Sequence, residues 1–530
     1  MKRWFAFLSC GLVAWIVFAE SPLDAHMARL RSFADGVCAV TNVAFCTEKP
    51  GDKVNPLAMW AAMSEVDEKS SDEGFVRVDF VLKPEEGSDI RCRIEVCRPD
   101  RWDGRLWGVG NSGQAGVLPR ITSYVKGGSA AMTTDLGTWA WVTPQRTRLR
   151  WPECVRRDFD WRATHLMCVY GRKLVEMFYG KAPRRVYFEG GSTGGRQAMS
   201  EAMRFPEDFD GIVAHLPDNV AIVSEAAIFH LWRTTHDEKG RQLFTVQQMK
   251  TVADAAVEYM SSRDPAPYAG QVVADGRWTE ADIDGFIALA ARKDPALADS
   301  GMQARLKSLY MPVYVDGRCV FTGFAPGTNH GFNMQWQSLM RFKRWLNGHG
   351  TDISAASPSE RAAIGWDRFD GFVRDEGSTY NACSPDLSRF AARGGKLLIT
   401  TGWEDQTIPP GPVVEYYERV CAAMGGIEKT KRFCRLYCHP GSGHGGGKGR
   451  KMTGVPSGNA ARGKFVEWCE KGTAPESYDT YWKAEKLVVP AAAYPGLMTR
   501  ASGGKWQERT QPRSKPAIDP FYLQCDVSPR

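Results

Sequence analysis

The chain has 530 residues, a formal net charge of +7 and 43% hydrophobic residues. A chain of this length can bury a large core and exceeds one usual domain. Its lysines and arginines are scattered rather than clustered, so we expect no nucleic-acid-binding surface.

The first 19 residues have the pattern of a secretory signal peptide. Lys2 and Arg3 precede an apolar run at 4–18, and small residues end at Ala19. The run is shorter than the roughly 20 residues that span a bilayer, although an N-terminal anchor helix is the alternative. No later stretch is long and apolar enough to cross a membrane. We therefore predict a secreted or periplasmic protein with no membrane contact after removal of residues 1–19.

The cysteine count fits an exported protein. Fourteen cysteines are present, and thirteen remain when Cys10 of the signal peptide is left out. In an oxidising compartment this number predicts several disulfides with at least one thiol unpaired. Cys38 and Cys46 are a candidate staple, but the spacing does not determine the pairing. No cysteine has zinc-site spacing with histidines.

The first half of the chain reads as strands and one long helix. Alternating apolar residues at 76–82 and 90–96 predict two antiparallel edge strands. A short strand at 106–109 runs into a glycine-rich loop at 110–116 that can bring backbone N–H groups to a reacting atom. Further along, 139–142 reads as a strand and 161–179 as an amphipathic helix.

A tight glycine turn lies between the next strand and helix. The strand at 186–188 leads into Gly190-x-Ser192-x-Gly194, and 197–203 continues as a helix. Strand, glycine turn and helix together are typical of a nucleophile elbow, which exposes a serine hydroxyl above a sheet. Ser192 is therefore the predicted nucleophile, whereas Ser112 in the earlier loop is a poor candidate.

The pattern after the elbow predicts a parallel sheet interrupted by an insertion. Residues 210–214 form the next strand. From residue 222 the pattern is helical, with helices expected at 246–260, 279–291 and 301–309, and the strand signal returns only at 395–400. The prediction is an α/β-hydrolase core with an inserted, mainly helical lid. The expected parts are a signal peptide (1–19), the first half of the core (20–221), the lid (222–370), and the second half with a C-terminal tail (371–530). Residues 500–517 read as a solvated tail.

Two later loops supply an acid and a base for Ser192. Asp405 follows the strand at 395–400, and His444 lies in a glycine loop after the strand at 433–438. The order serine, acid, histidine is that of α/β-hydrolases. His439 competes with His444 but sits at the strand end beside a proline, and Glu404 is expected at the surface. His165, within a helix, is expected to be structural.

At this point the sequence resembles the tannase and feruloyl esterase family. The match includes Ser-Thr-Gly-Gly-Arg-Gln at 192–197, Pro-Glu-Asp-Phe-Asp-Gly at 206–211, Gly-Trp-Glu-Asp at 402–405 and Pro-Gly-Ser-Gly-His at 440–444. It covers both halves of the core in the right order and is poor across the lid.

The resemblance implies a secreted serine esterase. Ser192 would be the nucleophile, His444 the general base and then acid, and Asp405 its orienting partner. The backbone N–H groups of Thr193 and Gly113 would form the oxyanion hole. The substrate would be a small aromatic ester of a hydroxycinnamic, gallic or terephthalic-type acid, free or attached to a plant polysaccharide or polyphenol.

Two departures from the family pattern concern a disulfide and a metal. The family usually joins a cysteine before the serine to one after the histidine, but here these positions are Gly191 and Gly445. The family's lid commonly holds calcium in an Asp-rich loop. Here only Asp264 and Asp275 are well placed, and calcium needs about six oxygen ligands. We therefore expect calcium to be absent or weakly bound, and no other cofactor.

Two other classes of function are compatible with the sequence. One is an α/β-hydrolase of different specificity, lipase-like or peptidase-like. The other is a hydrolase-fold binding protein whose triad is idle, because a triad is recognised by geometry that a sequence does not contain.

Overall fold

The computed structural model describes residues 22–47, 74–113, 116–141, 151–263, 278–331, 333–334, 357, 364–444, 459–482, 487–500, 506–510 and 517–527. The predicted signal peptide, the calcium candidates Asp264 and Asp275, and Gly445 lie outside these residues. Within them, no helix is both long and apolar enough to cross a membrane.

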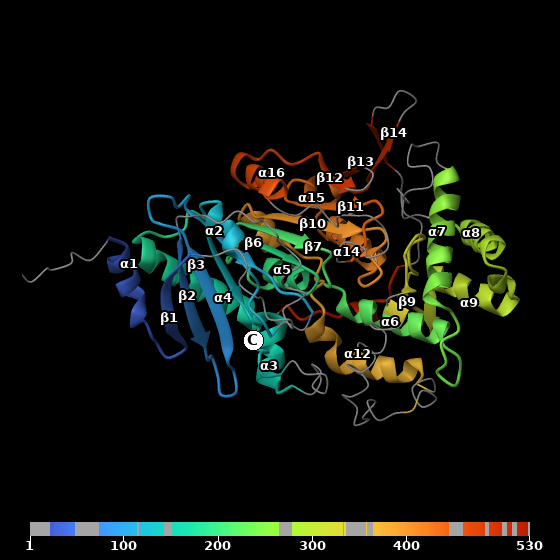
Figure 1. Cartoon of the computed structure of the whole chain (residues 1–530), viewed down its shortest axis with the longest axis horizontal. Helices are drawn as coiled ribbons and strands as arrows, with labels where there is room; N and C mark the ends of the chain where they lie inside the picture. The colour runs from blue at the N-terminus through green and yellow to red at the C-terminus, as the bar shows by residue number, and fades with distance from the viewer. Residues whose placement is uncertain are drawn as a thin grey trace, which may run out of the picture.

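A nine-stranded mixed sheet runs through the molecule in the order β1-β2-β3-β5-β4-β6-β7-β10-β11 (Figure 1). Three antiparallel strands form one edge: β1 (Cys38–Cys46), β2 (Phe75–Leu82) and β3 (Ile90–Val96). The remaining six strands are parallel to one another: β5 (Ala130–Thr134), β4 (Arg105–Val109), β6 (Arg185–Gly191), β7 (Gly211–His215), β10 (Lys396–Gly402) and β11 (Cys434–His439).

Helices cover both faces of the parallel strands, as the alternation along β6 shows. Tyr187 and Glu189 point toward α16 (Asn459–Lys471), where they meet Phe465 and Arg462. Phe188 and Gly190 point the other way, and Gly190 lies against α5 (Thr193–Arg204). The result is a three-layer arrangement, and the α/β core predicted from the strand and helix pattern is confirmed.

The other helices flank the sheet or connect its strands. They are α1 (Pro22–Arg31), α2 (Thr122–Lys126), α3 (Glu153–Arg157), α4 (Ala163–Tyr179), α13 (Ser388–Ala392), α14 (Pro410–Ala423) and α15 (Ile427–Thr430), with a π-helical turn over Asp158–Arg162 between α3 and α4. Of these, α4 packs on β5 and α14 on β10 and β11.

Between β7 and β10 the chain is mainly helical in its described parts. It contains α6 (Ala221–Thr235), α7 (Val246–Arg263), α8 (Glu280–Lys293), α9 (Ser300–Tyr310), the hairpin of β8 (Val313–Val315) and β9 (Arg318–Phe321), and α12 (Trp366–Tyr380). Figure 1 places α7, α8 and α9 at the end of the molecule farthest from β1. The lid boundaries at 222 and 370 stay predictions, and residue 370 falls inside α12.

The strand predictions failed where alternation misleads. The segment expected as a strand at 139–142 is a turn over its described residues. The strand β5 went unpredicted because all five of its residues are buried, so it has no polar alternation. The strand β1 went unpredicted because a register shift between Val40 and Asn42 interrupts its pattern.

The C-terminal part adds three small elements. Two hairpins pair β12 (Ser477–Trp482) with β13 (Leu487–Ala492), and β14 (Gly496–Arg500) with β15 (Trp506–Thr510). Residues 506–510 of the predicted tail thus form a strand, and its solvation stays a prediction. A 3₁₀ turn over Pro520–Leu523 then buries Tyr522 against α12, where its hydroxyl donates to Asp370 at 3.0 Å.

The structure joins no two of the thirteen described cysteines, and each carries a free thiol. The candidate staple of Cys38 and Cys46 is wrong, because the two residues are the ends of one nine-residue strand. At a rise of about 3.3 Å per residue they stand roughly 25 Å apart, far beyond a disulfide's reach.

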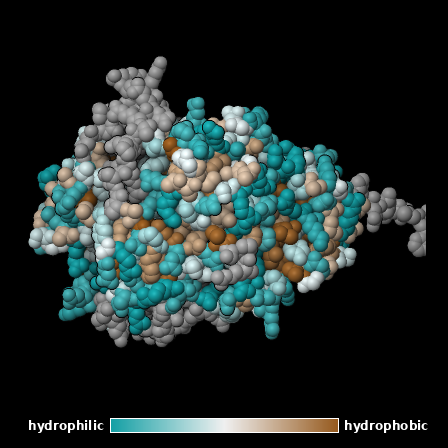
Figure 2. Space-filling view, turned by 180° about the vertical axis from the view of Figure 1, so that it is seen from behind, coloured by the Kyte–Doolittle hydropathy of each residue, from teal (hydrophilic) through white to brown (hydrophobic). Residues whose placement is uncertain are grey.

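The surface is mainly hydrophilic on the face in Figure 2, with apolar residues in patches among polar ones.

Candidate active site

The turn after β6 has the backbone geometry of a nucleophile elbow. Ser192 has φ +59° and ψ −119°, a region that side chains rarely adopt, and its N–H donates to the His215 carbonyl at 3.0 Å. The close crossing of strand and helix explains the flanking glycines. A Cβ on Gly190 would lie 2.5 Å from the Gly194 carbonyl oxygen, and one on Gly194 would lie 2.8 Å from that of Asn111. The turn therefore presents Ser192 at the carboxyl end of β6.

His444 and Asp405 complete a hydrogen-bonded chain with Ser192. The His444 Nε2 atom lies 3.1 Å from Ser192 Oγ, and Nδ1 lies 2.9 Å from Asp405 Oδ2. Asp405 is fully buried, and its other oxygen accepts the N–H groups of Thr407 and Ile408, both at 2.8 Å. This carboxylate is thus fixed in place, and it favours the imidazole with the proton on Nδ1, which leaves Nε2 free to accept from the serine.

The structure separates the chosen residues from their rivals. The His444 ring bonds to Asp405, and Glu404 is buried rather than at the surface as expected. His439 is fully buried at the end of β11, where burial, with a smaller effect from His215, lowers its pKa to about 3. Ser112 is exposed in the glycine loop. His165 bonds to Asp208, which is not one of the triad residues.

The glycine loop is attached to the start of α5 by three hydrogen bonds. The Thr193 hydroxyl donates to the Gly113 carbonyl at 2.5 Å, the Gly194 N–H donates to the Asn111 carbonyl at 2.8 Å, and the Asn111 N–H donates to the Gln197 side chain at 2.8 Å. Among the described residues, the N–H groups of Thr193 and Gly113 have no acceptor. The first N–H of a helix has no partner within the helix, so it is available to a ligand.

The loops carrying Asp405 and His444 brace each other, an arrangement that sequence reasoning missed. Backbone bonds join Trp403 N–H to the His439 carbonyl and Glu404 N–H to the Ser442 carbonyl, both at 3.0 Å. The Gln406 side chain accepts from the His444 N–H at 3.1 Å and donates to the His444 carbonyl at 3.4 Å. The only sequence signal was an amide residue directly after the predicted acid.

We expect Gln406→Leu to lower kcat about tenfold with little change in KM. The substitution removes both side-chain bonds to the His444 backbone, each worth roughly 1 kcal/mol, so His444 spends less time in reach of Ser192. Steady-state kinetics on any cleaved ester measures this. Gln406→Glu is the matched control: it still accepts from the His444 N–H and should retain more activity than the leucine variant. Equal activity of Gln406→Leu and the unmodified enzyme would show that the backbone bonds suffice.

A buried carboxylate three residues before the nucleophile ties the sheet to both flanking segments. Glu189 accepts from Tyr124 Oη at 2.7 Å and Arg462 Nε at 2.6 Å, and its other oxygen lies 3.2 Å from His215 Nε2. Burial alone would raise its pKa, but the bond to His215 and the charge of Arg462 outweigh this and lower the pKa to about 2. Glu189 thus stays ionised beneath the Ser192 turn.

We expect Glu189→Gln to destabilise the protein by about 3 kcal/mol at pH 7, because it leaves Arg462 buried without its counter-charge. The pKa of Glu189 is lower in the folded protein than its usual 4.5, so its contribution is complete above pH 4.5 and is lost as the pH falls toward 2. The difference in free energy of unfolding between the two proteins should therefore shrink over that range. Denaturant titrations at several pH values measure it, with the exposed Glu153→Gln as control. A pH-independent difference would contradict the ionised state of Glu189.

The elbow, the parallel strands and the chain from Ser192 through His444 to Asp405 define an α/β-hydrolase. Comparison with known proteins agrees. The family model described as "Tannase and feruloyl esterase" matches residues 76–292 and 362–503. The chain therefore belongs to the tannase and feruloyl esterase family and is a carboxylic ester hydrolase.

Individual relatives and solved structures resemble most of the chain. A probable feruloyl esterase B-2 of Aspergillus fumigatus is 27% identical over 419 residues, covering 76% of this chain and 77% of that protein. An uncharacterized esterase of Xanthomonas campestris pv. campestris is 29% identical, with 76% of each chain covered. The structure of feruloyl esterase B from Aspergillus oryzae has a TM-score of 0.72 at 20% identity and covers 91% of this chain and all of that one. Tannin acyl hydrolase from Aspergillus niger has a TM-score of 0.70 at 15% identity, with coverages of 95% and 97%. These two structures share the fold.

Proposed function

We propose that this hydrolase is a secreted serine esterase that cleaves esters of aromatic acids through an acyl-enzyme. The observation that carries the proposal is the chain of hydrogen bonds from Ser192 Oγ to His444 and on to the buried Asp405. An idle triad would need no such alignment, and an unmodified serine hydroxyl is a weak nucleophile without an adjacent base.

In the proposed reaction, His444 Nε2 takes the proton of Ser192 as its Oγ attacks the ester carbonyl. Asp405 stabilises the imidazolium that forms. The N–H groups of Thr193 and Gly113 are the proposed oxyanion donors, and the dipole of α5 favours negative charge at this point. His444 then protonates the departing alcohol. A water molecule, deprotonated by His444, attacks the acyl-enzyme and releases the acid and the free serine.

The aromatic character of the acyl group rests on relatives. Proteins named as feruloyl esterases are relatives of this chain, and a tannin acyl hydrolase has the same fold. We infer a hydroxycinnamic, gallic or terephthalic-type acid, with the alcohol either small or part of a plant polysaccharide or polyphenol. A lipase-like or peptidase-like specificity on the same core is the rival.

Export through a signal peptide at residues 1–19 is part of the proposal, and N-terminal sequencing of the exported protein tests it.

Outside the cell, oxidation would join cysteines into disulfides. Cys383 and Cys525 are the pair that we infer would join, because the Cys383 N–H donates to Cys525 Sγ at 3.3 Å. Mass spectrometry of a non-reduced digest would identify the linked peptides, whereas free thiols at both positions would contradict this pairing.

The test of the proposed function is hydrolysis of a panel of esters by the purified mature protein. The panel contains methyl gallate, methyl ferulate, mono-hydroxyethyl terephthalate, a short aliphatic ester and a peptide amide. A fluorophosphonate probe is added in parallel. We expect cleavage of at least one aromatic ester and labelling at Ser192. Preference for the aliphatic ester or the amide would favour the rival specificity, and an unlabelled, inactive protein would indicate an idle triad.

A further inference from the structure

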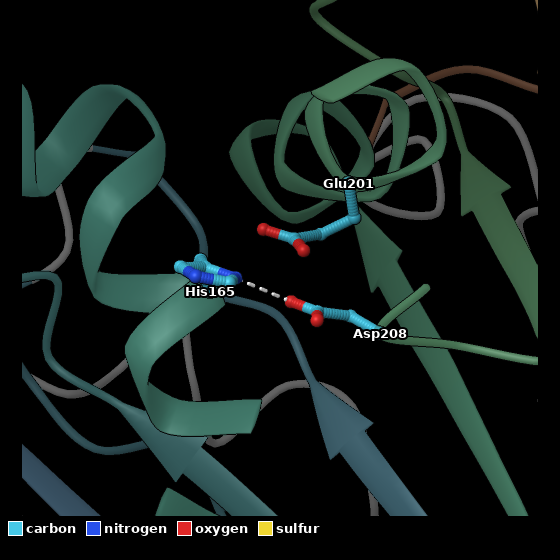
Figure 3. Close-up of side chains that lie close together, drawn as sticks. All are labelled: His165, Glu201 and Asp208. Atoms are coloured by element: carbon cyan, nitrogen blue, oxygen red, sulfur yellow. Dashed lines mark hydrogen bonds and ion pairs between the residues drawn. The ribbon is translucent and has the colours of Figure 1, made fainter. Parts of the chain in front are cut away.

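Three potential metal ligands converge away from the catalytic residues (Figure 3). They are His165 on α4, Glu201 on α5, and Asp208 in the connection from α5 to β7. One ligand atom from each lies within 4.8 Å of the other two. The His165 Nδ1 atom lies 2.7 Å from Asp208 Oδ2, and Figure 3 shows the Glu201 carboxylate directed from its helix toward both.

Glu201 is the residue that sets this cluster apart from an ordinary hydrogen-bonded histidine. It is fully buried, and neither of its carboxylate oxygens has a hydrogen-bond partner among the described residues. No described lysine or arginine forms an ion pair with it. Two ionised carboxyl groups this close repel each other, and a proton or a cation between them relieves the repulsion.

The neighbouring residues hold the ligands in place. The Phe205 ring stacks on His165, with ring centroids 3.8 Å apart and an angle of 12° between the planes. The Cys168 thiol and the Arg172 guanidinium both donate to the Asp208 backbone carbonyl, each at 3.4 Å, and so hold the segment that carries the Asp208 side chain. Supporting contacts of this kind orient the ligands in metal sites. The His165 side chain is 26% exposed and that of Asp208 10%, so an ion can enter from one edge.

We propose that His165, Glu201 and Asp208 bind one divalent transition-metal cation. A dication would neutralise the two carboxylates and supply the partner that the Glu201 oxygens lack. One imidazole and two carboxylates suit Mn²⁺ or Zn²⁺, whereas Ca²⁺ and Mg²⁺ prefer oxygen ligands alone. Water would complete the coordination from the exposed edge.

The site's position gives it a bracing role. Glu201 is nine residues beyond Ser192, about 13 Å along α5, so the ion is too far from the serine to take part in catalysis. Its ligands come from α4, from the last turn of α5 and from the segment leading to β7. A bound ion would therefore fix the far end of the helix whose first turn follows the nucleophile.

The test uses the full mature protein after chelation and buffer exchange. Mn²⁺ is the probe, because cysteine thiols elsewhere in the chain would compete for softer ions such as Zn²⁺. We expect equilibrium dialysis to give about one Mn²⁺ per chain and saturating Mn²⁺ to raise Tm by about 3 °C. Hydrolysis below Tm should not depend on the ion.

Matched variants decide whether the ion sits in this cluster. Glu201→Gln keeps the side chain's shape but removes its charge, and we expect about a 100-fold loss of Mn²⁺ affinity and no Tm rise. Glu207→Gln removes an exposed charge from the same connection and should bind like the unmodified protein. If Glu201→Gln does not fold, His165→Asn, at a partly exposed position, replaces it. Absent binding, or equal binding by both cluster variants and the unmodified protein, would overturn the proposal in favour of a proton shared by the two carboxyls.

Discussion

Ser192→Ala is expected to lower kcat about 10⁶-fold, to a level set by the proposed oxyanion donors alone. The hydroxyl lies 3.1 Å from His444 Nε2, and the strained turn at φ +59° holds it there. Alanine has no hydroxyl, so no acyl-enzyme can form. KM for the cleaved ester should change little, since no binding surface is removed. Steady-state kinetics and fluorophosphonate labelling measure both effects.

The matched control for that variant is Ser112→Ala. Ser112 is an exposed serine in the glycine loop, close in sequence to the proposed oxyanion donor Gly113. Its loss should leave kcat within a few-fold of the unmodified enzyme. Substantial activity in Ser192→Ala, or loss of activity in Ser112→Ala with continued labelling at Ser192, would mean that the mechanism has been assigned to the wrong serine or the wrong loop.

Asp405→Asn is expected to lower kcat about 10⁴-fold. One carboxylate oxygen accepts two backbone N–H groups, from Thr407 and Ile408. An asparagine must keep its carbonyl oxygen on those donors, which turns its NH₂ group toward His444 Nδ1. The imidazole would then carry its proton on Nε2 and donate to Ser192 instead of accepting from it. The loss thus comes from the wrong tautomer and not from a disturbed fold.

Glu404→Gln separates this effect from a general loss of negative charge in the acid loop. Glu404 is also buried, one residue before the Asp405 that bonds to the His444 ring. We expect it to retain kcat within about tenfold, and the Tm of Asp405→Asn to stay close to that of the unmodified enzyme. An Asp405→Asn protein that keeps most of its activity would show that His444 is oriented by other groups, such as Gln406.

The local chemistry of the site was predictable from the sequence because it lies in short segments. The glycines around Ser192 are needed wherever a strand turns directly into a helix, so their spacing alone marks the elbow. The order of Ser192, Asp405 and His444 follows the order of the parallel strands that carry them. The hydrogen bonds of the structure run from Ser192 to His444 and on to Asp405.

Contacts between distant segments could not be inferred in this way. The cysteine pair that usually joins the serine and histidine loops is replaced by Gly191 and Gly445, and Gln406 with two backbone bonds attaches the histidine loop to the acid loop. Glu189 directly follows the predicted strand at 186–188, and only the packing of α16 against β6 gives it Arg462 as a partner. The free thiols and the position of His165 beside Glu201 likewise depend on which segments meet.

The sequence by itself determined the strand–turn–helix around Ser192, the succession of parallel strands and the identity of the three residues that meet above them, because each of these depends on local backbone geometry and chain order. Only the tertiary structure decided what supports them. Burial between segments far apart in the chain explains the features that the sequence did not show. They are the strand β5 without alternation, the bracing of His444 by Gln406, the ionised Glu189 and the cluster of His165, Glu201 and Asp208. Burial changes the protonation state and the partners of a polar side chain.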